Sequence, residues 1–302
     1  MKAAAFAYLR ADDLPDALAW LAEHGADSKL IAGGQSLVPM MAMRLVRPAV
    51  LIDIGRIDTL KHRQVMPDLV RIGAGVRQRE VETDPRIARA LPLLRDALAW
   101  VGHVQTRNRG TIGGSLAHAD PSAELPLVAA VLDARLTLRA HAGPPRSVSA
   151  RDFFLGPMST AIGDTECLYE IDWPRWSGDG VGSAFQETAM RHGDFALAAA
   201  ACQLQVDADG RCLRAALGLG AVDGRPRAFD DLAKHLIGRP VDAALANEVA
   251  TLAAARVEPG TDPHADQAYR RHLAAVMLSR AILGAARAGQ ASDRQPGNGG
   301  RP

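Results

Sequence analysis

Two short glycine-rich segments constrain the fold of this chain more than any other feature. The first, Ala32–Ser36, follows a strand-like run at Lys29–Ile31 and precedes a helical pattern over Leu37–Val46. Adjacent glycines let the backbone reach positive φ and let a ligand approach the main chain closely. The N–H groups of such a turn can also surround phosphate oxygens. The segment therefore predicts a strand, a tight turn and a helix, and the turn is either an anion site or a plain connection.

The second segment, Arg107–Ser115, combines two arginines, several hydroxyl or amide donors and three glycines within nine residues. A pyrophosphate requires this mixture, because cations, hydrogen-bond donors and close backbone approach together offset the cost of removing it from water. An exposed basic loop, or a pair of arginines that faces a partner subunit, is the alternative. Neither segment contains the glycine fingerprints of nicotinamide-binding proteins or nucleoside triphosphatases.

The remaining sequence predicts a mixture of helices and strands, and therefore an α+β fold. Residues 77–82 predict a polar turn or a short helix. Helical periodicity recurs in Leu14–His24, Leu91–Trp100, Leu125–Leu132, Asp242–Arg256 and Asp266–Ala288. Strand-like runs occupy Ala49–Ile54, Leu69–Ala74, Arg135–Ala140, Glu166–Trp173, Ala196–Val206 and Cys212–Leu219.

The length of 302 residues is about twice that of a typical domain, which predicts two domains. Proline, tryptophan, serine and glycine crowd together in Pro174–Gly182, and we place the boundary there. The polar residues of Gly289–Pro302 predict a disordered tail.

Charge and cysteine content exclude several classes of protein. Lys and Arg number 35 against 34 Asp and Glu, so the net charge of +1 gives no bulk reason to bind nucleic acid or an anionic membrane. The three cysteines cannot supply the four thiolates of an iron–sulfur cluster, and no local metal site is expected. The sequence also lacks a signal peptide and any apolar run long enough to span a membrane, which predicts a cytoplasmic protein.

Three segments together carry a resemblance to a known family. Residues 31–48 (IAGGQSLVPMMAMRLVRP), 105–126 (QTRNRGTIGGSLAHADPSAELP) and 182–200 resemble the FAD-binding medium subunit of molybdenum hydroxylases. That family includes the medium chain of carbon monoxide dehydrogenase and the flavin domain of xanthine dehydrogenase. The resemblance spans nearly the whole chain except the tail.

The resemblance implies a bipartite FAD-binding domain of the vanillyl-alcohol-oxidase (PCMH) type over residues 1–175, with subdomains at about 1–60 and 61–175. A small α+β domain of the carbon monoxide dehydrogenase flavoprotein type would follow over residues 178–288, and residues 289–302 would form the tail.

The resemblance also implies which residues bind FAD. The first glycine segment would hold the pyrophosphate, and Ser115 stands where relatives often have Asn. Gln186 replaces a lysine that some relatives carry, which puts a charged role there in doubt. No catalytic side chain and no metal ligand is expected, because the flavin itself carries the redox chemistry. The implied cofactor-binding residues are Ile31, Ala32, Gly33, Gly34, Gln35, Ser36, Thr111, Gly114, Ser115, Glu124, Leu168 and Gln186.

Histidines near these segments, at positions 103, 118 and 192, are interpreted as surface or packing residues rather than bases. Phe195 is ambiguous, because an aromatic side chain there could shield a flavin face or simply lie in the core.

By resemblance, the chain is expected to be an electron-transfer subunit. Its FAD would accept electrons from the 2Fe-2S clusters of a small subunit and pass them to an external acceptor. A large molybdopterin subunit would hydroxylate the substrate within a heterotrimer or a dimer of heterotrimers. Two alternatives stay open: a self-contained FAD-dependent oxidase or reductase of the same cofactor fold, and a non-catalytic scaffold whose glycines only form turns.

Overall fold

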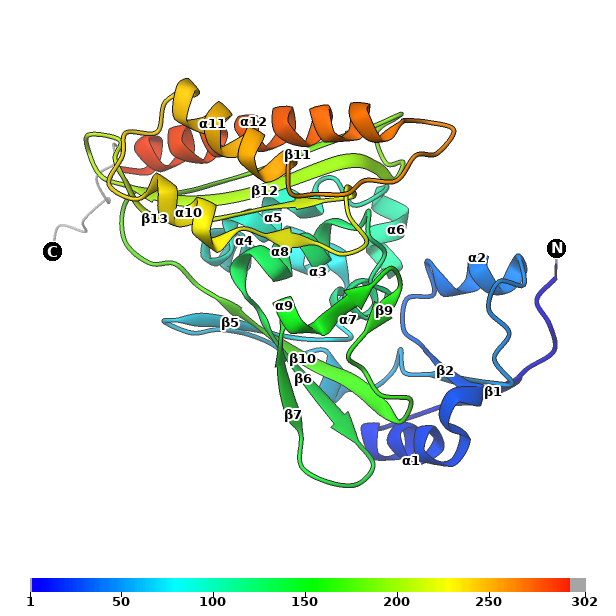
Figure 1. Ribbon diagram of the computed structural model, residues 1–302. Helices are drawn as coiled ribbons and strands as arrows, with labels where there is room; N and C mark the ends of the chain where they lie inside the picture. Colours follow the sequence, from blue (N-terminus) through cyan, green and yellow to red (C-terminus); the bar gives the residue numbers. More distant parts are fainter. Residues whose placement is uncertain (1, 294–302) are drawn as a thin grey trace, which may run out of the picture.

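The structure, a computed structural model, describes residues 2–293 and has an α+β fold (Figure 1). Three larger sheets follow one another along the sequence, and a two-stranded ribbon of β8 (Phe154–Gly156) and β9 (Ser159–Thr160) falls within the sequence range of the second sheet. The first sheet lies to one side of the body, whereas the second and third enclose a layer of helices.

The first sheet is parallel, with the strand order β1-β3-β2. Parallel strands end at the same edge, so the residues that follow β2 and β3 meet there. In the register, Ile31 at the end of β2 lies beside Asp53 at the end of β3. The elements of this part are β1 (Ala7–Arg10), α1 (Leu14–His24), η1 (Gly25–Asp27), β2 (Ser28–Ile31), α2 (Leu37–Ala42), β3 (Val50–Asp53) and η2 (Asp58–Leu60).

The second sheet is antiparallel, with the order β4-β5-β10-β6-β7, and helices cover one of its faces (Figure 1). Its strands are β4 (Arg63–Val65), β5 (Leu69–Gly73), β6 (Arg135–Ala140), β7 (Arg146–Ser149) and β10 (Glu166–Pro174). The helices are α3 (Gln78–Thr83), α4 (Pro85–Ala90), α5 (Pro92–Leu98), α6 (Val104–Arg109), α7 (Ile112–His118), α8 (Glu124–Leu132) and α9 (Ala150–Phe153).

The third sheet is antiparallel, with the order β11-β12-β13-β14. One face packs against α12, and the other packs against α5 and α8. Its elements are β11 (Val181–Ala189), β12 (Ala196–Val206), β13 (Cys212–Gly220), β14 (Arg227–Ala228), α10 (Asp230–Leu236), α11 (Ala243–Ala254) and α12 (Gln267–Asp293).

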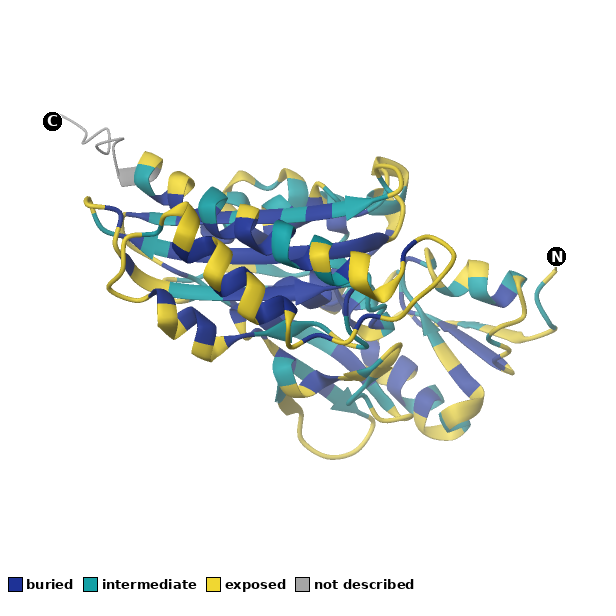
Figure 2. Ribbon diagram, turned by 45° about the horizontal axis from the view of Figure 1, so that its top comes forward, coloured by how far each residue is buried: buried dark blue, intermediate teal, exposed yellow. Residues whose placement is uncertain are grey.

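The helices between the two antiparallel sheets form the largest core. In α8 every residue from Leu125 to Leu132 is buried, because both sides of this helix face a sheet. Figure 2 shows the buried residues concentrated in the strands and inner helices, with exposed residues on α11, α12 and the loops. Helix α8 is therefore apolar on all sides, as expected for a fully buried helix.

Several predicted elements agree with the structure. Leu14–His24 forms α1, with Asp13 accepting the N–H of Asp16 as N-cap and Gly25 at φ 48° ending the helix. The strands predicted at Arg135–Ala140 and Ala196–Val206 have the same limits as β6 and β12. The first two segments are periodic, so local sequence identifies them, whereas the alanine-rich β12 is a strand with both faces buried, one against α12 and one against the inner helices.

Three predictions need correction. The helix predicted over Leu37–Val46 ends at Ala42, and Arg44 takes φ 60°, a left-handed conformation that stops a helix. The second glycine segment is not a loop throughout, because Ile112–His118 forms α7. The tail predicted to be disordered from Gly289 begins inside α12, which continues to Asp293, and its last nine residues lie outside the described residues.

Candidate functional site

A cavity of about 480 Å³ opens at the edge of the parallel sheet where β2 and β3 end. We call it the turn cavity, because the first glycine segment forms one of its walls. Residues from β1, β2, α2, the end of β3 and the end of α6 surround it. Its lining residues are Tyr8, Ile31, Ala32, Gly33, Gly34, Gln35, Val38, Pro39, Asp53 and Arg109.

The glycine turn has a defined geometry. Gly34 takes φ 71°, which L-residues rarely adopt, and its carbonyl accepts the N–H of Val38 at 3.1 Å. The amide of Gln35 donates to the Gly33 carbonyl at 3.1 Å. A Cβ on Gly33 would lie 2.3 Å from the carbonyl oxygen of Arg109. Gly34 therefore permits the turn, and Gly33 permits the two glycine segments to touch.

The Arg109 carbonyl oxygen is the point where the two segments meet. The Arg77 guanidinium donates a hydrogen bond to it, and the Arg77 N–H donates to Glu80 at 2.9 Å. Burial, followed by the nearby charge of Arg109, lowers the pKa of Arg77. Arg77 therefore fixes the second segment against the first, and no sequence pattern indicated this contact.

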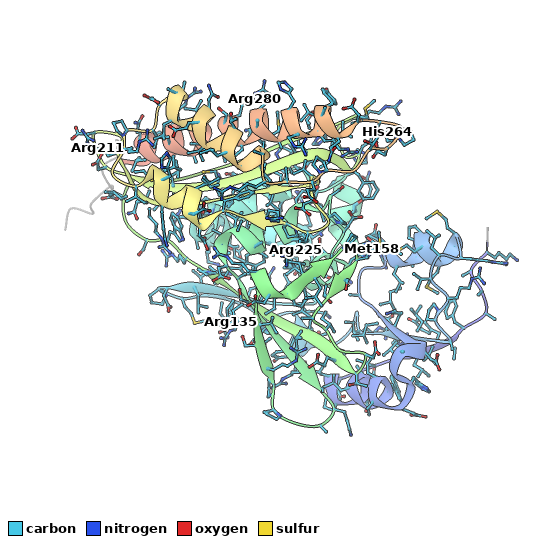
Figure 3. The ribbon with its side chains drawn as sticks, in the orientation of Figure 1. Arg135, Met158, Arg211, Arg225, His264 and Arg280 are labelled. Atoms are coloured by element: carbon cyan, nitrogen blue, oxygen red, sulfur yellow. The ribbon has the colours of Figure 1, made fainter. Side chains whose placement is uncertain are left out.

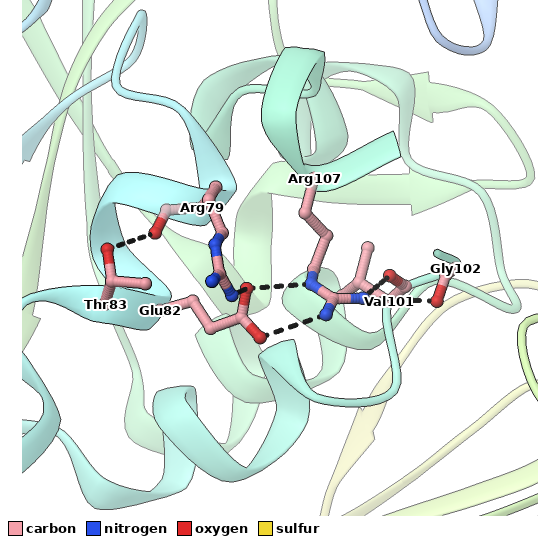
Figure 4. Close-up of polar contacts among 6 residues, drawn as sticks. All are labelled: Arg79, Glu82, Thr83, Val101, Gly102 and Arg107. Carbon is pink, nitrogen blue, oxygen red and sulfur yellow. Dashed lines mark hydrogen bonds and ion pairs between the residues drawn. The ribbon is translucent and has the colours of Figure 1, made fainter. Parts of the chain in front are cut away.

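The two arginines of the second segment have different environments. Arg107 makes a bidentate ion pair with Glu82 at 2.9 and 3.0 Å and donates to the carbonyls of Val101 and Gly102 (Figure 4). Glu82 also accepts from Arg79 at 2.9 Å. Arg107 is thus committed to joining α6 to α3, which corrects the expectation that both arginines are available to an anion.

Arg109, in contrast, is exposed and lines the turn cavity without an acidic partner among residues 2–293. The Arg77 guanidinium also reaches this wall, since it donates to the Arg109 carbonyl, and the charges of Arg10 and Arg56 act on Tyr8. The arginines labelled in Figure 3 belong instead to β6, to α12 and to the loops before β13 and β14. Arg109 is therefore the arginine that lines the cavity, and further positive charge lies close to it.

The glycines after Arg109 have mainly structural roles in α7. The Thr111 hydroxyl caps this helix by accepting the N–H of Gly114 at 2.9 Å. A Cβ on Gly113 would lie 2.4 Å from that of Ala74, so this glycine lets α7 pack onto the residues that follow β5. Local sequence suggested a loop here, but the packing of α7 requires glycines within the helix.

Asp53 and Tyr8 form a polar pair on the cavity wall that sequence reasoning missed. The Tyr8 hydroxyl donates to one oxygen of Asp53, which raises the pKa of Tyr8, and the Gly55 N–H donates to the other oxygen at 2.8 Å. An acid at the end of the strand that follows a glycine turn is a signal known from dinucleotide-binding proteins. That signal was available in the sequence.

The remaining predicted site residues lie outside the lining of the turn cavity. Ser36 comes directly before α2, and Ser115 lies within α7. Leu168 is 5% exposed and belongs to the core of the second sheet. Gln186 lies on the same face of β11 as Gly182 and Ala184. That face packs against α12.

Glu124 and Glu187 form a second group of interest, between α8 and the third sheet. Burial, and secondarily the charge of Asp120, raises the pKa of Glu124 to about 7. Burial and the charge of Glu124 raise the pKa of Glu187 to about 8. Glu187 is 8% exposed, and its Oε2 has no hydrogen-bond partner within residues 2–293. Strand alternation places Glu187, not Gln186, on the inner face of β11.

The β11–β12 connection carries the aromatic residue that the sequence left ambiguous. Phe195 is 75% exposed and so does not belong to the core. Nearby, the ring of His192 lies edge-on to Trp100 at 6.0 Å, and Gly193 packs against the ring of His103. These two histidines act as packing residues in this structure, as predicted.

The turn cavity offers chemistry suited to a nucleotide. Backbone N–H groups of the turn and the free Arg109 guanidinium can bind phosphate oxygens. Asp53 can accept hydrogen bonds from hydroxyl groups, and Ile31 and Val38 supply apolar contacts. Gly33 lets the Arg109 backbone approach the turn closely, so both glycine segments border the cavity. These donors, acceptors and spaces fit a dinucleotide such as FAD.

Comparisons with known proteins agree with this geometry. Residues 4–176 match the family described as the FAD binding domain in molybdopterin dehydrogenase. Residues 183–285 match the CO dehydrogenase flavoprotein C-terminal domain. Together these matches span the three sheets.

Individual relatives are similar over nearly their whole length. The chain is 37% identical to subunit alpha of the 6-hydroxypseudooxynicotine dehydrogenase complex of Paenarthrobacter nicotinovorans, covering 93% of this chain and 95% of the relative. It is 35% identical to the carbon monoxide dehydrogenase medium chain of Afipia carboxidovorans, covering 92% and 95%. Among solved structures, quinoline 2-oxidoreductase of Pseudomonas putida matches with a TM-score of 0.90 and 38% identity, covering 96% of this chain and 100% of the other.

The described part of the chain holds neither a cluster of metal ligands nor a membrane-spanning helix. Within residues 2–293, no three His, Cys, Asp or Glu side chains are grouped so that they could hold a metal ion. No helix in the same range has the length and apolar character needed to cross a membrane.

Proposed function

The chain belongs to the family of FAD-binding subunits of molybdopterin dehydrogenases, and on that premise we propose that it transfers electrons between a partner's 2Fe-2S clusters and an external acceptor. It is an FAD-containing oxidoreductase subunit of a molybdenum hydroxylase. The observation that carries the proposal is the turn cavity, whose glycine turn and free arginine are suited to the FAD pyrophosphate.

The first glycine segment and Arg109 of the second glycine segment would bind FAD jointly. The turn at residues 31–36 provides N–H donors for the pyrophosphate, and Arg109 neutralises its charge. Arg77 keeps the two segments in register through the Arg109 carbonyl. The resemblance implies Thr111, Gly114, Ser115, Glu124, Leu168 and Gln186 as further contacts around the flavin, although they are not part of the cavity lining and the face of β11 that carries Gln186 packs against α12.

Bound FAD supplies a carrier that takes up and releases electrons. The chain's contribution is to bind it, orient it and tune its surroundings. Because this chain has only three cysteines, all of them buried, iron–sulfur clusters must belong to another chain. A small 2Fe-2S subunit and a large molybdopterin subunit are therefore the proposed partners, in a heterotrimer or a dimer of heterotrimers in the cytoplasm.

We also propose that the chain divides into an FAD-binding domain over residues 1–175 and a C-terminal domain over residues 178–288. The first would consist of two subdomains, at about 1–60 and 61–175. The strands of the three sheets fall at 7–53, 63–174 and 181–228, which supports these limits.

The test is the composition of the complex that contains this chain. We would purify the tagged chain from its native host and measure FAD, molybdenum, iron and acid-labile sulfide in each companion chain. We expect FAD on this chain, iron and sulfide on a smaller companion, and molybdenum on a larger one. Titration with a reductant should then reduce the clusters and the flavin of one assembly, as followed by electron paramagnetic resonance and visible absorbance.

Other outcomes would contradict the proposal. FAD on a lone chain that oxidises an organic substrate would identify a self-contained flavoenzyme. A folded chain that never contains flavin would identify a scaffold. A matched variant complex with Gly33→Val should keep iron and molybdenum but lose FAD, and reduced clusters should then persist when an acceptor is added.

A further inference from the structure

We propose that Asp53, oriented by Tyr8, accepts hydrogen bonds from the hydroxyl groups of the adenosine ribose of FAD. This inference rests on the proposed function and assigns the adenosine ribose of FAD to the Asp53 side of the turn cavity. It makes Asp53 a residue that selects a dinucleotide with an intact ribose.

The topology places Asp53 where a ribose acceptor is needed. Strand β2, the glycine turn, α2 and strand β3 form a parallel β-α-β unit, and Asp53 ends the second strand. Asp53 follows Gly33 by 20 residues. In dinucleotide-binding units a glycine turn holds the pyrophosphate, and an acid about 20 residues later accepts the ribose hydroxyl. This chain reaches the same arrangement without the G-x-G-x-x-G fingerprint.

The wall of the turn cavity carries a carboxylate, that of Asp53, as well as the Arg109 guanidinium. A carboxylate placed directly against a pyrophosphate would repel it, whereas Arg109 and the turn N–H groups attract it. The carboxylate of Asp53 must therefore face a part of the ligand that donates hydrogen bonds. The vicinal hydroxyls of a ribose meet this requirement, and the adenosine ribose of FAD is joined directly to the pyrophosphate through its 5′ oxygen.

Asp53 has the right capacity for this role. Each carboxylate oxygen already accepts one hydrogen bond, from Tyr8 or from Gly55, and each can accept another. These two bonds fix the orientation of the carboxylate before the ligand arrives, which reduces the entropy lost on binding. Tyr8 lies on β1, which is paired with β3, and it also lines the cavity. It therefore positions Asp53 from the neighbouring strand.

The experiment compares FAD with analogues that lack the 2′- or the 3′-hydroxyl of the adenosine ribose. The intact complex is freed of flavin and titrated with each compound, and dissociation constants are measured from flavin fluorescence. The wild-type complex should prefer FAD over at least one deoxy analogue by about 10- to 100-fold, as expected for a hydrogen bond to a charged group. In Asp53→Ala, affinity for FAD should fall by a similar factor and the preference should disappear.

Further variants keep the inference falsifiable if Asp53→Ala folds poorly. Asp53→Asn preserves the shape of the side chain and should lose part of the preference, and Tyr8→Phe should weaken FAD binding by a smaller factor. Asp58→Ala is the matched control, because Asp58 is an exposed acid shortly after β3 that forms an ion pair with Lys61. It should leave all affinities unchanged.

The possible failures are distinguishable. If Asp53→Ala and Asp53→Asn weaken FAD and both deoxy analogues equally, or keep the wild-type preference, the ribose assignment is overturned while the proposed function stands. If the wild-type complex binds no FAD at all, the proposed function fails and the ribose assignment fails with it.

Discussion

Gly33 lies so close to the Arg109 carbonyl that only a hydrogen fits where other residues carry a Cβ. A Cβ there would lie 2.3 Å from the carbonyl oxygen, and backbone cannot move aside as a flexible side chain can. We therefore expect Gly33→Ala to separate the two glycine segments and to lower FAD affinity by at least tenfold. The measurement is the dissociation constant of FAD from the intact complex.

Gly25→Ala is a suitable control for Gly33→Ala. Gly25 ends α1 at φ 48°, and a Cβ there meets nothing within 4 Å. The substitution strains the backbone and should cost about 1 kcal/mol of stability, but it should not change FAD affinity. Equal FAD affinity in Gly33→Ala and the wild type would contradict the close contact between the segments.

At the scale of single residues, the sequence predicts the glycine turn but only part of its surroundings. The turn is local, and the flanking strand and helix identify it. The contact of Gly33 with Arg109, the Arg77 hydrogen bond and the Tyr8–Asp53 pair depend on how distant segments pack. Of these residues, only Asp53 has a signal in the sequence, which is its distance from the glycines.

At the scale of elements, the pairing of α3 with α6 makes a testable contribution to stability. The side chains of Arg107 and Glu82 are 11% and 17% exposed, so removing one partner leaves a poorly solvated charge behind. We expect Arg107→Met to lower the free energy of unfolding by about 2–3 kcal/mol, less than for a fully buried pair. Urea denaturation of the purified chain measures this.

Two controls accompany Arg107→Met. Arg86 pairs with Asp84 but its own side chain is 72% exposed, so Arg86→Met should have little effect on the urea midpoint. The double variant with Glu82→Gln should recover part of the lost stability, because Arg107→Met alone leaves the Glu82 carboxylate with only Arg79, a more exposed partner. If Arg107→Met is as stable as the wild type, the ion pair has no structural role and Arg107 becomes available to an anion again.

Helix α7 shows why some elements could not be predicted. Its sequence begins Ile-Gly-Gly-Ser, and glycine lowers helix propensity by about 1 kcal/mol per residue. The helix forms nevertheless, because Thr111 caps it and Gly113 allows it to touch Ala74 closely. Tertiary packing overrides local propensity here, and only the folded neighbours reveal it.

At the scale of the whole molecule, the family and the order of its parts could be recognised from three sequence segments, because glycine turns have local signatures. How the third sheet packs on the helices of the second part could not. Glu187 faces Glu124 across that contact, and no spacing in the sequence links a strand residue with a helix start 63 positions earlier.

This contact predicts a pH dependence of stability. Folding raises the pKa of Glu124 to about 7 and that of Glu187 to about 8, from an ordinary value of 4.5. A carboxyl group whose pKa is higher in the folded state holds its proton better when folded. The contribution of Glu124 and Glu187 to the free energy of unfolding is therefore fully present below about pH 4.5 and is lost as the pH rises from there to about 8. The loss is about 1.4 kcal/mol for each pH unit that separates the folded and unfolded pKa values.

Variants of Glu187 separate this effect from the other ionisable groups. Glu187→Gln imitates the protonated side chain, so its unfolding free energy should decline less than that of the wild type between pH 5 and 8. Glu258→Gln, at an exposed position after α11, should behave like the wild type. Urea midpoints of the three proteins at intervals across this range make the comparison. Parallel curves for Glu187→Gln and the wild type would mean that Glu187 is already ionised in the folded chain, and that water or a bound ligand solvates it between α8 and the third sheet.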